Sequence, residues 1–207
     1  MKSKAEKFWD NQAKSYDREE AKDSEKYEHI IEKTKAYLQP HYLALDVGCG
    51  TGRFSNELAH KVKQIDAIDF SKKMIEVAKA NTLSKGITNV NYTQATITDT
   101  QLEPQKYDVI LCFYLLHLPD NPEEAMRRAK ELLKPGGVLI SVTPCMGENP
   151  VLGFLFSILG RLNLLPKIRL FKQPDLVALI TEAGYAIAEM ELVPGTANQY
   201  FIVAKSS

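Results

Sequence analysis

The chain has 207 residues, which suits one domain that buries a core without disulfides or a structural metal. Its 26 basic and 26 acidic residues cancel, so no overall positive charge attracts nucleic acid, and we expect no nucleic-acid partner. Three cysteines without a Cys-x-x-Cys spacing argue against a disulfide framework or zinc site. Because the first residues are also too polar for a secretory signal, we expect a cytoplasmic protein without a metal.

Residues 1–40 are predicted to be helical, because apolar residues recur at helical spacing from Tyr27 to Leu38 and Pro40 ends the pattern. We expect this segment to lie against a sheet.

From Leu43 onward, segments with strand and helix patterns alternate, which predicts parallel strands joined by right-handed helical crossovers. The expected strands are 43–47, 64–69, 89–93, 107–113 and 138–143, with helices at 53–62, 72–84 and 122–133. A last helix near 174–183 precedes two strands, 186–193 and 199–204, that read as a hairpin. The sequence therefore predicts a single α/β domain over residues 1–207.

Three alternate glycines, Gly48, Gly50 and Gly52, stand between the first strand and its helix. Without Cβ atoms they let the backbone approach a bound nucleoside, and Asp69 ends the next strand at the spacing of a carboxylate that binds ribose hydroxyls. The alternative is a plain glycine turn with a surface Asp. A nicotinamide dinucleotide site is disfavoured, because its motif requires a third glycine where this chain has Arg53.

The segment Asp46–Gly52 resembles motif I of the class I S-adenosylmethionine-dependent methyltransferases, and Asp69-Phe70-Ser71-x-x-Met74 resembles the segment that follows it. Residues 107–118 and 132–140 are similar to that family's fourth strand with its exit and to the turn into its fifth. The nearest resemblance is to the small-molecule branch of quinone and metabolite methyltransferases. It implies a Rossmann-like sheet of seven strands, mostly parallel with the last antiparallel, and helices on both faces.

The same resemblance implies S-adenosylmethionine as the cofactor. Asp69 would accept its ribose hydroxyls, Phe70 and Met74 would flank adenine, and Tyr16 would reach its carboxylate from a closing N-terminal helix. Thr96 and Ile97, after the third strand, would also touch the adenine. The family commonly has Asp at the place of Thr96, so the usual contact to the adenine amino group would fall to Asp99 from a shifted loop or to the Thr96 hydroxyl. The residues expected at the cofactor are Tyr16, Asp46, Gly48, Cys49, Gly50, Asp69, Phe70, Met74, Thr96, Ile97 and Cys112.

Three of these assignments have structural alternatives. Asp46, placed by resemblance near the cofactor's amino group, could instead cap a helix or bond a turn. Tyr16 could be an ordinary apolar anchor of an amphipathic helix. Cys112 and Cys145, after neighbouring strands, could form a soft-ligand pair or act as small buried hydrophobes.

The expected reaction is in-line methyl transfer to a small, partly apolar acceptor, which chiefly requires orientation and exclusion of water. His117, just past the fourth strand, is the best-placed general base, although a structural histidine fits as well, and Tyr114 is expected to line the pocket. The alternative function is a methyltransferase-like protein that binds cofactor without turnover and acts as a partner or sensor. The sequence leaves monomer and homodimer open.

Residues 145–173 interrupt the alternation of strands and helices. Residues 151–159 are apolar on nearly every face, and basic residues follow them without an acid. We expect a helical lid over an apolar acceptor, with at most weak membrane-surface contact through residues 151–172. The alternative is a helix packed over the site and a loop with solvated charges.

Overall fold

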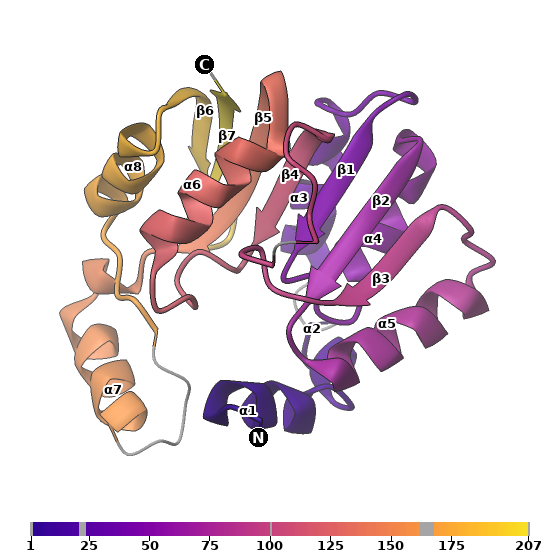
Figure 1. Ribbon diagram of the computed structural model, residues 1–207. Helices are drawn as coiled ribbons and strands as arrows, with labels where there is room; N and C mark the ends of the chain where they lie inside the picture. Colours follow the sequence, from indigo (N-terminus) through magenta and orange to yellow (C-terminus); the bar gives the residue numbers. More distant parts are fainter. Residues whose placement is uncertain (1, 21–23, 100, 162–167, 207) are drawn as a thin grey trace.

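The computed structural model describes residues 2–20, 24–99, 101–161 and 168–206. Its strands are β1 (Leu43–Val47), β2 (Gln64–Asp69), β3 (Val90–Gln94), β4 (Tyr107–Phe113), β5 (Leu133–Pro144), β6 (Tyr185–Leu192) and β7 (Gln199–Ser206). They form one seven-stranded sheet in the order β3-β2-β1-β4-β5-β7-β6 (Figure 1).

The pairing confirms the predicted Rossmann-like topology. Strands β1 to β5 run parallel to one another, whereas β7 runs antiparallel to both β5 and β6. The strand order reverses between β1 and β4, because the chain moves outward to β3 and then returns to the other side of β1. Such a reversal leaves a crevice at the carboxyl ends of the strands, where α/β proteins bind ligands.

Helices cover both faces of the sheet, as predicted. One core packs α3 (Ser24–Lys35), α4 (Arg53–Leu58) and α5 (Lys72–Ser84) against it, and the other packs α6 (Pro122–Leu132) and α8 (Gln173–Glu182). The start of α6 shows why these boundaries form. Pro122 occupies its first turn, and the Asn121 side chain accepts a hydrogen bond from the Glu124 backbone nitrogen at 3.1 Å.

The N-terminal segment differs from a single helix that ends at Pro40. Its described residues form α1 (Lys4–Gln12), α2 (Tyr16–Glu20) and α3, which ends at Lys35. Only α3 follows the apolar periodicity into the core, since it buries Tyr27, Ile30, Ile31 and Thr34. None of the residues of α1 is buried.

A second difference lies between α6 and β5. The helix ends at Leu132 and the strand begins at once, because Leu133 already pairs with Tyr107 of β4. The register then shifts before Val109 pairs with Val138, so β5 begins earlier than the predicted strand 138–143. The predicted hairpin of the last two strands is present as β6 and β7.

The carboxyl ends of the parallel strands point toward α1, and α7 (Pro150–Arg161) stands beside the same edge of the sheet (Figure 1). The short helices η2 (Ala59–Lys61) and η3 (Met146–Glu148) complete the described elements. No helix among the described residues has both the length and the apolar character needed to cross a membrane.

Candidate functional site

The glycine turn after β1 is a tight backbone structure that depends on the absence of side chains. Gly48 has φ of +70°, and its backbone nitrogen donates to the Ile68 carbonyl oxygen at 2.8 Å. A Cβ atom on Gly48 would lie 2.8 Å from the Leu115 Cδ1 atom, closer than real contacts allow. The turn therefore leaves its backbone open toward the space at the end of the strands.

Asp69 ends β2 beside this turn and is 8% exposed. Its carboxylate accepts hydrogen bonds from the Gly50 nitrogen at 3.1 Å and the Ser71 nitrogen at 2.8 Å. Burial raises the pKa of Asp69 to about 6, although these two backbone donors act in the opposite direction. Each carboxylate oxygen keeps a lone pair that a ligand hydroxyl could use.

Asp46 lies deeper, at 2% exposure, and accepts a hydrogen bond from the Ser55 hydroxyl at 2.5 Å. Burial raises its pKa to about 7, and the nearby Asp69 carboxylate adds to the effect while Ser55 opposes it. Asp46 is not among the described residues that line the cleft. Its structural role is to hold the glycine turn's helix through Ser55 on α4.

A cleft of about 600 Å³, including the solvent at its mouth, opens between the glycine turn, the end of β2 and the exit of β4. Its lining residues are Trp9, Tyr16, Gly48, Cys49, Gly50, Thr51, Arg53, Phe54, Asp69, Phe70, Met74, Phe113, Tyr114, Leu115 and Leu118. Most of the residues predicted for the cofactor are thus brought together with Tyr114. One side of the cleft is polar and glycine-rich, and the other is aromatic and aliphatic.

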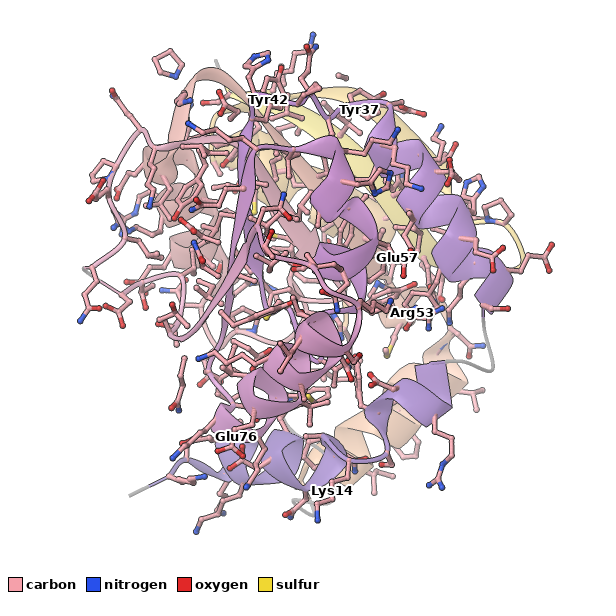
Figure 2. All side chains as sticks on the ribbon, turned by 90° about the vertical axis from the view of Figure 1, so that its right-hand side faces the viewer. Lys14, Tyr37, Tyr42, Arg53, Glu57 and Glu76 are labelled. Carbon is pink, nitrogen blue, oxygen red and sulfur yellow. The ribbon has the colours of Figure 1, made fainter. Side chains whose placement is uncertain are left out.

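The apolar side of the cleft was not predicted in detail. The Phe54 and Phe113 rings lie with their centroids 4.3 Å apart, and Leu115 and Leu118 continue the wall. Arg53 stands at the lower end of α4 in Figure 2, with its guanidinium 4.0 Å from the Tyr27 ring centroid. The sequence signal for these residues was their place directly after the glycine turn and after β4.

Tyr114 follows β4 in an unusual backbone conformation. Its φ of +54° is uncommon outside glycine and carries a conformational cost. The conformation is held by a hydrogen bond from its nitrogen to the Val142 oxygen at 2.8 Å, and its hydroxyl donates to the Gln199 Oε1 atom at 3.0 Å. The ring is thereby fixed in the cleft wall.

His117 does not line the cleft among the described residues. It is 8% exposed, and burial lowers its pKa to about 4, so the ring is neutral near pH 7. Its Nδ1 atom has no hydrogen-bond partner within the part of the chain that the structure describes. The His117 carbonyl oxygen accepts from the Arg169 nitrogen at 2.8 Å, which ties this loop to the segment before α8.

Three further predicted cofactor residues also lie outside the lining. Thr96 is exposed and its hydroxyl lies 3.0 Å from that of Thr98, whereas Ile97 is buried. Cys112 packs in the core beneath α6 and α8, where burial raises its pKa. Cys145 lies in the same core, so both thiols occupy the environment of small buried hydrophobes.

Residues 38–167 match the family model of the methyltransferase domain. The ubiquinone biosynthesis O-methyltransferase of Nitrosospira multiformis is 36% identical over 156 residues, which are 70% of this chain and 63% of that protein. The enzyme of the same name from Marinobacter nauticus is 40% identical over 131 residues, or 60% of this chain and 53% of that protein. The matched part thus spans 53–63% of these two relatives' length.

Solved structures share the fold at lower identity. The YcgJ protein of Bacillus subtilis superposes with a TM-score of 0.72 at 19% identity, covering 86% of this chain and 98% of that one. A SAM-dependent methyltransferase from Aquifex aeolicus gives 0.68 at 18% identity, covering 86% and 89%. With a family model that matches more than half of its residues, the chain belongs to the methyltransferase domain family.

Proposed function

We propose that this protein is an enzyme that transfers the methyl group of S-adenosylmethionine to a small, partly apolar acceptor. The observation that carries the proposal is the Asp69 carboxylate, buried beside an open glycine turn and facing the same cleft as an aromatic wall. Membership in the methyltransferase domain family supports the same activity.

The polar side of the cleft fits the cofactor. Asp69 has unused lone pairs for the ribose hydroxyls, and Phe70 and Met74 lie beside it in the lining, where they would flank the adenine. The backbone of Gly48 and Gly50 would pass under the methionine part. Tyr16, whose Cε1 atom lies 3.6 Å from where a Cβ atom on Gly50 would stand, would reach its carboxylate.

When bound, S-adenosylmethionine supplies a methyl group that its sulfonium has already activated. The protein then has to hold the acceptor in line and exclude water. Phe54, Phe113 and Leu118 provide an apolar surface for this, and the fixed ring of Tyr114 limits how an acceptor can lie.

The acceptor atom we propose is a hydroxyl oxygen. The relatives from Nitrosospira multiformis and Marinobacter nauticus are named as O-methyltransferases, and the aromatic wall suits a ring or an apolar chain next to the hydroxyl. His117 stays a proposed base. With a pKa of about 4 and a buried ring, it would need the 115–118 loop to move before it could take a proton. Unchanged turnover and pH profile in His117→Gln would exclude it.

An N-terminal segment and an internal segment would complete the site. We propose that residues 1–40 close over the cofactor and that residues 145–173 form the lid, of which 162–167 lie outside the described residues. In α7, Val151 is 77% exposed, Phe154 69% and Ile158 37%, and their spacing places them on one helical face. We further propose a cytoplasmic monomer or homodimer that acts without nucleic acid and touches membranes at most weakly through 151–172.

Methyl-labelled S-adenosylmethionine and a metabolite extract would test the function. We expect the label to appear in a small apolar compound, which mass spectrometry would identify. Binding of S-adenosylhomocysteine without any labelled product would instead favour a cofactor-binding protein without turnover.

A further inference from the structure

Asp10 lies on α1, but its hydrogen-bond partners lie on the connection between β2 and α5. The Asp10 Oδ1 atom accepts from the Ser71 hydroxyl at 2.7 Å and from the Lys73 backbone nitrogen at 3.1 Å. The Oδ2 atom accepts from the Lys2 Nζ atom at 2.5 Å. Its side chain is only 10% exposed, although α1 buries none of its residues fully.

Ser71 connects Asp10 to the proposed ribose site. Its backbone nitrogen donates to the Asp69 Oδ1 atom at 2.8 Å, and its hydroxyl also caps α5 by accepting from the Met74 nitrogen at 3.2 Å. The two carboxylates are thus joined through one residue.

Gln94 provides a second link between α1 and this connection. The Gln94 side-chain nitrogen donates to the Phe70 carbonyl oxygen at 3.0 Å and to the Glu6 carboxylate of α1 at 3.4 Å. Helix α1 is therefore joined to the connection between β2 and α5 directly through Asp10 and indirectly through Gln94 of β3, and Figure 2 shows it running past the first part of α5, where Glu76 is labelled.

The position of α1 matters because Trp9, next to Asp10, lines the cleft. The Trp9 ring lies with its centroid 6.1 Å from that of Tyr16, which also lines the cleft. No residue of α1 is buried, so its hydrogen bonds to the rest of the domain help to position Trp9, and through the Trp9 ring also Tyr16 at the start of α2. Although partial burial raises the pKa of Asp10, the hydrogen bonds from Lys2, Ser71 and Lys73 outweigh it and lower the pKa to about 2. The carboxylate is therefore ionised at neutral pH.

We infer that Asp10 is a positioning residue that latches α1 onto Ser71, and through it onto Asp69, so that Trp9 and Tyr16 close over bound cofactor. The inference rests on the function proposed above, and nothing in the motif resemblance assigned Asp10 a role. The inference predicts that cofactor binding and the ordering of helix α1 on the domain are coupled.

The test compares Asp10→Ala with Asp10→Asn and Lys2→Ala, using S-adenosylhomocysteine as the probe in stopped-flow binding. Asp10→Ala should raise the Kd of S-adenosylhomocysteine about tenfold, because the loss of one charge-assisted hydrogen bond has an effect of this size. Most of the change should be a faster dissociation rate. Asp10→Asn keeps an oxygen that can accept from Ser71 and Lys73, so it should recover most of the affinity. Lys2→Ala removes only the exposed partner and should bind like the wild type.

Amide exchange of residues 4–16 separates a latch from a structural cap. In the wild type the probe should slow exchange in this segment, and in Asp10→Ala it should do so much less. If Asp10→Ala lowers the melting temperature of the free protein but leaves the dissociation rate and this protection unchanged, Asp10 merely caps α5 and the inference is wrong. If the probe does not change amide exchange of residues 4–16 in the wild type, the inference is also wrong, whether or not the variant folds. A wild type that does not bind the probe at all would instead refute the proposed function.

Discussion

Two buried carboxylates, Asp46 and Asp69, lie near the ends of neighbouring strands and have different surroundings. Asp69 faces the cleft and accepts from backbone nitrogens of Gly50 and Ser71, whereas Asp46 lies behind the turn with Ser55 as its partner. Burial raises the pKa of both, to about 6 for Asp69 and about 7 for Asp46. Of the two, only Asp69 is among the described residues that line the cleft.

Replacing Asp69 by Ala should weaken binding of S-adenosylhomocysteine at least tenfold, because a hydrogen bond to a charged group contributes roughly 1.5–3 kcal/mol. Calorimetry gives the dissociation constant, and circular dichroism checks that the fold is kept. An unchanged constant would show that another residue holds the ribose.

Affinity for S-adenosylhomocysteine should rise with pH between about 5 and 7 and then level off. Below its pKa of about 6, Asp69 carries a proton and loses acceptor capacity. Above this pKa, the ionised carboxylate would accept hydrogen bonds from both ribose hydroxyls of the ligand. Asp46 titrates in the same range with a pKa of about 7, so Asp46→Asn serves as the control that isolates Asp69. A constant affinity across this range in that variant would contradict the assignment.

Gly48→Ala should both destabilise the protein and weaken cofactor binding, because Leu115 and the turn beside the cleft must shift. The new Cβ would lie 2.8 Å from Leu115 Cδ1, and the φ of +70° adds about 1 kcal/mol or more of backbone strain. Gly86→Ala is a matched control, since Gly86 has φ of +66° but nothing within 4 Å of its Cβ position. Equal losses of unfolding free energy in the two variants would show that the contact with Leu115 does not matter.

At the scale of elements, α7 carries an apolar face that the described core does not cover. Phe154→Ser should therefore leave the melting temperature and cofactor affinity nearly unchanged, because Phe154 is already 69% exposed. It should lower kcat/KM for the true acceptor severalfold if that face closes over the substrate. Leu83→Ser on α5, at 81% exposure, is the control that should change neither quantity. A large fall in melting temperature without ligand would mean that α7 is part of the core instead of a lid.

The order of strands and helices could be predicted from sequence because each has its own apolar period, and the start of α6 carries a clear capping signal. Periodicity could not show where β5 begins, since that depends on the pairing of Leu133 with Tyr107 in another strand. Nor could it show the break between α1 and α3, because α1 has no buried face to mark it.

The exit of β4 shows why part of the site escaped prediction. Alternation along the strand places Cys112 in one core and Phe113 in the other, toward the cleft. Tyr114 then takes a positive φ, so the alternation stops there. Which of Leu115, His117 and Leu118 would face the cleft therefore depended on a backbone turn that the sequence does not reveal.

At the scale of the molecule, the reversal of strand order between β1 and β4 determines where the cleft can form. It brings together the glycine turn, the end of β2 and the β4 exit, which are far apart in the chain. Helices α1 and α7, from opposite parts of the sequence, stand at this same edge (Figure 1). The ends of the sheet strands thus form one side of the cleft, and the elements proposed to select the acceptor lie outside the sheet.

We propose that this cleft binds an adenosyl sulfur compound through Asp69 and the glycine turn. Titration calorimetry with S-adenosylhomocysteine and, separately, with NAD tests it most directly. We predict binding of S-adenosylhomocysteine to a single site and no heat of binding with NAD, because Arg53 stands where the dinucleotide motif needs a glycine. Binding of NAD without any response to S-adenosylhomocysteine or S-adenosylmethionine would contradict the claim.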